Sequence, residues 1–177
     1  MELSPAKQSF PKGAMESGHD LLQLVSFHLG GEEFGLDILR VQEIIRIQPL
    51  TRVPNSPDFI AGVMNLRGRI IPVVALRRRF GMEQSAPDKQ TRIVVVETEG
   101  AVLGFIVDAV SEVLRIPSST IEPPPRVGKV EREYVSGVGK LDDRLLILLD
   151  VDRLIADSAD GNSTVASGLA KKVNGEL

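Results

Sequence analysis

Two blocks of the sequence recur in the same order, and this internal repeat restricts the fold more than any other feature. The block "FGLDILRVQEIIRI" (34–47) matches "LGFIVDAVSEVLRI" (103–116) at an offset of 69 residues. The block "FIAGVMNLRGRIIPVV" (59–74) matches "YVSGVGKLDDRLLILL" (134–149) at an offset of 75. Chains rich in Val, Ile and Leu produce chance matches, so either block alone is weak evidence. Two blocks in the same order predict two similar lobes.

Four pairs of apolar runs flank short turn sequences, which predicts β-hairpins. The predicted turns are the "LGG" after residue 28, Arg67–Gly68, the "EGA" after residue 98, and Asp142–Asp143. We assign Gly68 as the structural turn residue, with a positive φ. The sequence therefore predicts an all-β fold with subdomains at about 21–80 and 90–150. Each has about five short strands, which suits a small barrel.

Short helical turns are expected at 40–45, 76–80 and 151–156, the last as a C-terminal helix. The ordered domain is predicted to span 20–157. The Pro-, Gly- and Ser-rich segment 1–19 and the small, polar segment 158–177 are predicted to be flexible tails. The stretch "PPPRVGK", which begins at Pro123, is predicted to be a loop because of its prolines.

Composition removes several classes of function. With 21 basic and 24 acidic residues the net charge is -3, which argues against nucleic-acid binding. The chain has no cysteine, so neither a disulfide framework nor a thiolate metal site is expected. No apolar run reaches membrane-spanning length, and no signal-peptide pattern is present. We expect a cytoplasmic protein without a cofactor or a metal.

The residues that suggest catalysis each have a simpler interpretation. His28 lies on a predicted strand with no second histidine or cysteine to support a ligand or base role. Asp142 and Asp143 resemble a carboxylate pair, but aspartate is favoured in hairpin turns. The basic run "LRRRF" (76–80) is typical of a solvated helical face, with contact to an acidic partner as the alternative.

Glu43 and Arg67 differ from these because each is a charge within an apolar neighbourhood, "VQEII" and "MNLRG". A carboxylate–guanidinium pair would satisfy both charges. Two independent surface charges are the alternative. In the repeat alignment Glu43 matches Glu112, whereas Arg67 falls opposite Asp142. The pair is therefore predicted to be particular to the first half, as a functional feature would be.

At this point the chain resembles the CheW family of chemotaxis coupling proteins. The resemblance runs from about Leu22 to Ile155 and rests on "FGLDILRVQEI", "FIAGVMNLRGRIIPVV", "FIVDAVSEVL" and "YVSGVGKLDDRLLILLDVDRLI". It implies two SH3-like, five-stranded β-barrel subdomains and no enzymatic activity. It also implies an adaptor that joins the regulatory domain of a CheA-type histidine kinase to the cytoplasmic tip of methyl-accepting chemoreceptors, in signalling arrays at the membrane.

The resemblance also assigns residues to these contacts. Kinase docking on the first subdomain would involve Val41, Leu50 and Gly62. Receptor binding and coupling would involve Glu43, Ile44, Arg67, Gly104, Val110 and Val113. One departure is Ala75, where the family often has aspartate, and a helix-capping contact is expected to be missing there. The free protein is expected to be a monomer that does not insert into the membrane.

Two other readings remain open from the sequence. A small-molecule-binding or enzymatic β-barrel would need a pocket with convergent polar groups, and the sequence supplies no evident set. Alternatively, the duplication is purely structural, and Glu43 and Arg67 serve stability alone.

Overall fold

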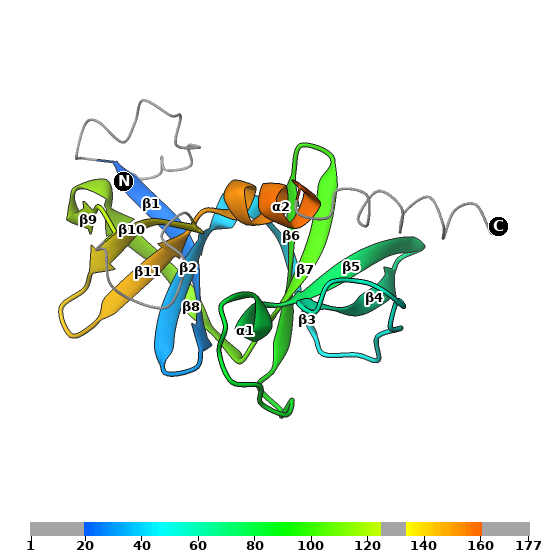
Figure 1. The fold of residues 1–177 in the computed structure, drawn as a ribbon. Helices are drawn as coiled ribbons and strands as arrows, with labels where there is room; N and C mark the ends of the chain where they lie inside the picture. The colour runs from blue at the N-terminus through cyan, green and yellow to red at the C-terminus, as the bar shows by residue number, and fades with distance from the viewer. Residues whose placement is uncertain (1–19, 125–133, 161–177) are drawn as a thin grey trace.

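The computed structural model describes residues 20–124 and 134–160, which form mostly β-strands in two sheets (Figure 1). In chain order the elements are β1 (Leu21–Leu29), β2 (Glu32–Asp37), η3 (Ile38–Arg40), β3 (Val41–Arg46), β4 (Ile60–Leu66), β5 (Arg69–Ala75), α1 (Leu76–Arg79), β6 (Arg92–Thr98), β7 (Ala101–Val107), β8 (Ala109–Pro117), η4 (Ser118–Thr120), β9 (Ile121–Glu122), β10 (Val135–Lys140), β11 (Leu145–Leu149) and α2 (Val151–Asp160). The predicted all-β class is confirmed at this level.

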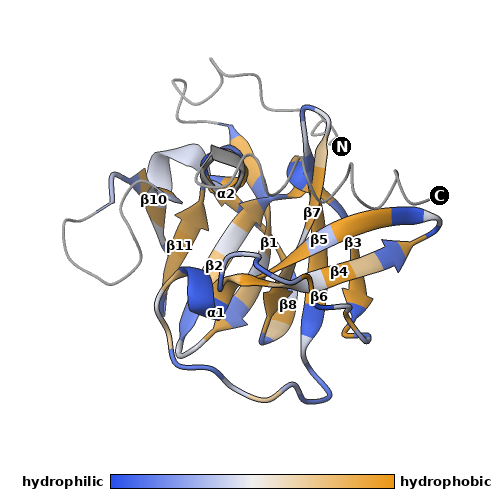
Figure 2. Ribbon diagram, turned by 45° about the vertical axis from the view of Figure 1, so that its right-hand side comes forward, coloured by the Kyte–Doolittle hydropathy of each residue, from blue (hydrophilic) through white to orange (hydrophobic). Residues whose placement is uncertain are grey.

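All four predicted hairpins are present as antiparallel strand pairs. They are β1–β2, β4–β5, β6–β7 and β10–β11. In Figure 2 the strands are mainly apolar and the turns between them mainly polar, which is the pattern that identified the hairpins in the sequence. Hairpins are local structures, so their turn residues and flanking strands are visible in a short stretch of chain.

Two of the three predicted helical turns are confirmed. Helix α1 begins at Leu76 after Ala75, whose side chain makes no capping hydrogen bond, as expected. Helix α2 begins at Val151 and continues to Asp160, so residues 158–160 are helical and not part of a tail. The predicted turn at 40–45 is wrong: a short 3-10 turn ends at Arg40, and β3 then pairs with β6. The predicted tail at 1–19, the rest of the C-terminal tail and most of the proline loop lie outside the described residues.

Each sheet combines strands from both halves of the chain. One sheet has the order β8-β1-β2-β11-β10-β9 and the other the order β3-β6-β7-β5-β4. In Figure 1 the blue strands β1 and β2 lie among the green to orange strands β8 to β11. We call the first the A sheet and the second the B sheet. Sheet membership thus does not follow the predicted division of the chain into 21–80 and 90–150.

Apart from the additional short strand β9, the two sheets have the same topology, which confirms that the sequence repeat is a structural repeat. The offset of 69 relates β1, β2 and β3 to β6, β7 and β8, and the offset of 75 relates β4, β5 and α1 to β10, β11 and α2. Even the parallel pairings correspond, because Val73 pairs with Gly104 and Leu148 with Gly35. In each sheet, the first two strands of one repeat pair with the third and the last strands of the other.

The hydrophobic core has three parts. The largest lies between the sheets and contains buried side chains from both, together with Leu76 of α1 and Leu154 of α2. A second cluster belongs to the B sheet and a third to the A sheet. In the cluster between the sheets, the ring of Phe34 stacks on that of Phe27, with centroids 5.7 Å apart, and on that of Phe80, with centroids 5.9 Å apart. Burial of this apolar surface is the main force holding the repeats together.

Candidate functional site

Glu43 and Arg67 form the ion pair that the sequence suggested. Arg67 Nη2 donates to Glu43 Oε1 at 2.8 Å, and Arg67 Nη1 donates to Glu43 Oε2. Glu43 lies on β3 and Arg67 in the turn after β4, so the pair connects the two edge strands of the B sheet. The Arg67 side chain is 73% exposed and that of Glu43 is 21% exposed. This places a two-pronged charge pair at the surface, where a partner has access to it.

The turn that carries Arg67 has an unusual backbone. Arg67 has φ of 52° and Gly68 φ of 87°, and the flanking residues Leu66 and Arg69 pair directly. Two positive φ values in a two-residue loop match a type I′ turn, for which Asn-Gly is the preferred sequence. Asn65 Oδ1 accepts a hydrogen bond from Gly68 N at 2.8 Å and supports the loop. The positive φ predicted at Gly68 is confirmed, but the one at Arg67 was not foreseen.

The contact changes the pKa of both partners in the direction that favours their charged forms. The hydrogen bonds from Arg67 hold the pKa of Glu43 below its usual value, and those to Glu43 raise the pKa of Arg67. The pair is therefore fully charged near neutral pH.

The prediction that such a pair is particular to the first half is wrong. Glu112, the counterpart of Glu43, accepts a hydrogen bond from Arg144 Nη2 at 3.3 Å. Arg144 corresponds to Arg69, which lies two positions after Arg67. The arginine of the second half is therefore not at Asp142, the position aligned with Arg67. Arg144 also donates to the buried Glu33 at 2.6 Å. Both sheets therefore join an edge-strand glutamate to an arginine at a hairpin, but with arginines at different positions.

The remaining predicted receptor positions divide by exposure. Ile44 on β3 is 39% exposed and its counterpart Val113 on β8 is 55% exposed, so both present apolar surface. Val110 is half-buried and packs on the core between the sheets. Gly104 is buried in β7, where a Cβ atom would lie 2.7 Å from Ile93 Cγ2. Gly104 is thus closely packed and has no exposed surface to offer a partner.

Of the three predicted kinase positions, Gly62 and Leu50 lie close together, whereas Val41 packs on a different core cluster. A Cβ atom on Gly62 would lie 2.7 Å from the carbonyl oxygen of Thr51 and 3.1 Å from Leu50 Cβ. The close backbone approach expected at Gly62 is therefore made by the protein's own chain. Leu50 packs on the B-sheet core, whereas Val41 packs on the core between the sheets.

The basic run at 76–80 is not a simple solvated face. Arg77 forms an ion pair with Asp108, and Arg79 lies between the rings of Phe59 and Tyr134 at 4.8 Å from each centroid. Arg79 also donates a hydrogen bond to the Tyr134 hydroxyl. Arg78 alone of the three is exposed, and it donates to the Asp58 carbonyl oxygen at 3.0 Å.

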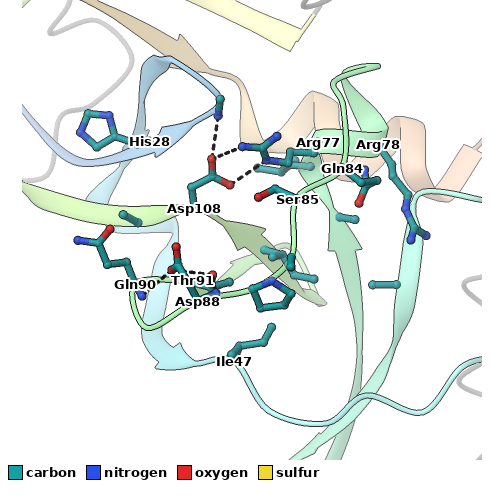
Figure 3. Close-up of a pocket in the computed structure, with 18 residues that line it drawn as sticks. His28, Ile47, Arg77, Arg78, Gln84, Ser85, Asp88, Gln90, Thr91 and Asp108 are labelled. Carbon is teal, nitrogen blue, oxygen red and sulfur yellow. Dashed lines mark hydrogen bonds and ion pairs between the residues drawn. The ribbon is translucent and has the colours of Figure 1, made fainter.

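A cleft of about 820 Å³ opens between the sheets, and the Arg77–Asp108 pair forms part of its wall (Figure 3). Arg77 Nε and Nη2 donate to the two Asp108 oxygens at 2.9 and 2.6 Å, and Arg77 Nη1 donates to the Glu83 carbonyl. Partial burial tends to raise the pKa of Asp108, but hydrogen bonds from Arg77 and Gly30 N hold it below its usual value. These groups already satisfy one another, so they are poorly suited to capture a small ligand.

The candidates for catalysis remain unsupported. His28 is exposed on β1, and Asp142 and Asp143 lie in the bend between β10 and β11. Within residues 20–124 and 134–160, no group of three or more His, Cys, Asp or Glu side chains is placed to hold a metal ion. Across the same described ranges, no helix has the length and apolar character needed to cross a membrane.

Sequence reasoning missed the partners that come from distant strands. The contacts of Arg144 with Glu33, Arg77 with Asp108, and Arg40 with Asp152 all join the two halves of the chain. The repeat alignment carried one usable signal: α1 and α2 align, and Arg77 falls opposite Asp152. Arg77 pairs with Asp108, which lies just before β8, and Asp152 pairs with Arg40, which lies just before β3. The two ion pairs therefore correspond in the repeat, but the acidic and basic partners are exchanged.

Comparisons with known proteins identify relatives that match most of this chain. Residues 23–159 match the CheW-like domain. The chain is 42% identical over 135 residues to "Chemotaxis protein CheW" of Klebsiella aerogenes, which covers 76% of this chain and 81% of the relative. It is 34% identical over 149 residues to "Chemotaxis protein CheW" of Helicobacter pylori, a match that covers 84% of this chain and 90% of the relative.

A solved structure shows the same likeness in three dimensions. It is the scaffolding protein TtCheW of Thermoanaerobacter tengcongensis, with a TM-score of 0.70 and 43% identity over 73% of this chain and 88% of that one. The family match spans most of the chain, and two relatives above 30% identity are covered over more than two thirds of their lengths. This chain therefore belongs to the CheW-like domain family.

Proposed function

We propose that this protein is a non-enzymatic adaptor that couples methyl-accepting chemoreceptors to a CheA-type histidine kinase in cytoplasmic arrays at the membrane. The names of its relatives, a chemotaxis protein and a scaffolding protein, support this class of function. The observation that carries the proposal is the exposed Glu43–Arg67 pair, which joins β3 to the β4–β5 hairpin next to the exposed Ile44. A surface of this kind binds another protein, because apolar area supplies affinity and the charges set the register.

Both sheets offer such a surface. In the B sheet Ile44 on β3 and Ile70 on β5 are exposed, and their counterparts Val113 and Leu145 are exposed in the A sheet. We assign the receptor contact to Glu43, Ile44, Arg67 and Val113, with Val110 and Gly104 supporting that surface from beneath.

Kinase docking falls on the first-repeat part of the B sheet. Leu50 and Gly62 pack against each other and fix the path of the chain before β4. We propose that they and Val41 shape the surface that the kinase regulatory domain binds. The Thr51–Val63 bridge holds this segment to the edge strand β4.

We further propose that each sheet curls into an SH3-like barrel. In the B sheet the Glu43–Arg67 pair links the first strand in the order to the hairpin of the last. The B-sheet core takes side chains from all five strands, including Ile45 of β3 and Met64 of β4. A flat sheet does not bring both edges to one core.

Pull-down with the kinase regulatory domain and with a receptor signalling fragment tests the function. Ile44→Asp and Val113→Asp are expected to weaken partner binding at least tenfold, because each puts a charge into an apolar contact. Leu21→Asp is the matched control: Leu21 is 44% exposed at the start of β1 and is not among the residues assigned to either partner. Native binding by both variants would contradict the proposal. Tight binding of a metabolite without any kinase binding would favour a ligand-binding protein instead.

A further inference from the structure

Neither half of the chain contains a complete sheet. The first half gives the A sheet only the hairpin β1–β2, and the second half gives the B sheet only the hairpin β6–β7. A hairpin alone is at best marginally stable in water, because it buries too little apolar surface. Each hairpin is held by strands of the other half on both sides: β8 and β11 flank β1–β2, and β3 and β5 flank β6–β7.

The contact between the halves has the character of a protein core. Phe27 and Phe34 of the first half are fully buried, and they share one apolar cluster with Phe105 and Tyr134 of the second half. The ion pairs Arg77–Asp108, Arg40–Asp152 and Arg144–Glu33 add polar contacts around it. Surfaces of this kind resemble those of obligate dimers, which remain associated without a covalent link.

The covalent connection between the halves is an exposed segment. Residues 83–90 are all exposed, and the chain enters β6 at Arg92. The segment is held by the bond from Arg77 Nη1 to the Glu83 carbonyl and by the turn in which Asp88 N donates to Thr91 Oγ1 at 2.8 Å. It contributes no strand to either sheet. The linker thus keeps the two halves close together, while the strand pairing and the core hold them to each other.

We propose that the two halves, residues 20–82 and 91–160, behave as two interlocked subunits, and that a second copy of this chain can supply either half. In the resulting exchanged dimer, each pair of sheets would contain the first half of one chain and the second half of the other. The surface involved is continuous with the ladders and core already present within one chain. Symmetric exchange of identical elements is a known low-cost route to dimers. The proposal does not depend on the adaptor function.

Cleavage of the folded protein tests whether the halves bind each other. A specific protease site placed between Ser85 and Ala86 allows the full chain to fold first and to be cut afterwards. We expect the cut protein to elute as one particle with the mass of the uncut chain. Its melting temperature should rise with protein concentration, whereas that of the uncut protein should not. Separation of the cut halves under native conditions would overturn the proposal.

Linker length tests the exchange. Deletion of residues 84–88 should prevent closure within one chain and yield a dimer of native fold, whereas insertion of five Gly/Ser residues at the same place should leave a monomer. A folded, monomeric deletion variant would overturn exchange. The cleavage result still decides whether the halves associate if the deletion variant is insoluble.

Complementation provides a stricter test in the shortened chain. Gly62→Val disrupts the first half, where a Cβ would lie 2.7 Å from Thr51 O, and Gly137→Val disrupts the second, where it would lie 2.5 Å from Ile121 Cγ2. Exchange between the two variants places both defects in one pair of sheets and leaves the other pair unaltered. A refolded mixture should show a wild-type melting transition that neither variant shows alone. Its absence from the mixture would argue against exchange.

Discussion

Glu43 and Arg67 lie 24 positions apart and join opposite edges of the B sheet through two hydrogen bonds. Arg67 has a φ of 52°, a left-handed backbone conformation that is unfavourable for arginine. Positive φ values are uncommon for residues other than glycine, asparagine and aspartate. A side chain kept at such a position is a candidate for a role beyond stability.

Replacement of Arg67 by asparagine should separate stability from function. Asn-Gly is the preferred pair for a type I′ turn, so relief of the backbone offsets the loss of an exposed ion pair. We expect a chemical-denaturation midpoint equal to or above that of the wild type, together with weakened receptor–kinase coupling in a reconstituted assay. Arg69→Ala, at an exposed neighbouring residue on β5, is the control and should retain coupling. A clear fall in stability with coupling intact would assign Arg67 a structural role.

Two glycines of the first repeat should differ in their sensitivity to alanine. At Gly62 a Cβ would lie 2.7 Å from a backbone oxygen, whereas at Gly68 no heavy atom is within 4 Å. Gly62→Ala should therefore destabilise the protein by about 2 kcal/mol or more, because backbone must move. Gly68→Ala should cost about 1 kcal/mol, because only the left-handed backbone is strained. Urea denaturation measures both, and equal effects would show that the Thr51 segment yields easily.

Asp108 should make stability depend on pH in the acid range. Its folded-state pKa is lowered, so the ionised carboxylate stabilises the fold fully above the ordinary value of 3.8, and this contribution is lost as pH falls through the folded-state pKa. Asp108→Asn should cost about 1–2 kcal/mol at pH 7, since a charged hydrogen-bond acceptor is lost. The difference from the wild type should shrink as the pH falls below 3.8 and passes through the lowered folded-state pKa. Denaturation at several pH values checks this, and a constant difference would contradict it.

The C-terminal helix should depend on Asp150. Its Oδ1 accepts a hydrogen bond from Arg153 N at 3.1 Å, which satisfies one of the free N–H groups in the first turn of α2. Asp150→Ala should destabilise the protein by about 1 kcal/mol, as expected for loss of a cap. Asp142→Ala, in an exposed bend, is the control and should change stability little. The aligned position in the first repeat is Ala75, so α1 begins without such a cap.

Features set by neighbouring residues were predictable from the sequence. The hairpin at Arg67–Gly68 could be read from a glycine between two apolar runs, and α1 and α2 began where expected. The Glu43–Arg67 pair could also be anticipated, because both charges lie among apolar residues. The turn expected at 40–45 failed because pairing of β3 with β6 prevails over local helical preference.

The sequence by itself determined the repeat, the hairpins and the all-β class, because each depends on contacts within a few residues. Only the tertiary structure decided how the repeats combine, since the same hairpins are compatible with sheets built within one half or between halves. It also decided that Arg144 answers Glu112 and Asp108 answers Arg77. Those partners are brought together by ladders and a core that extend across the whole chain. No short stretch of sequence contains that information.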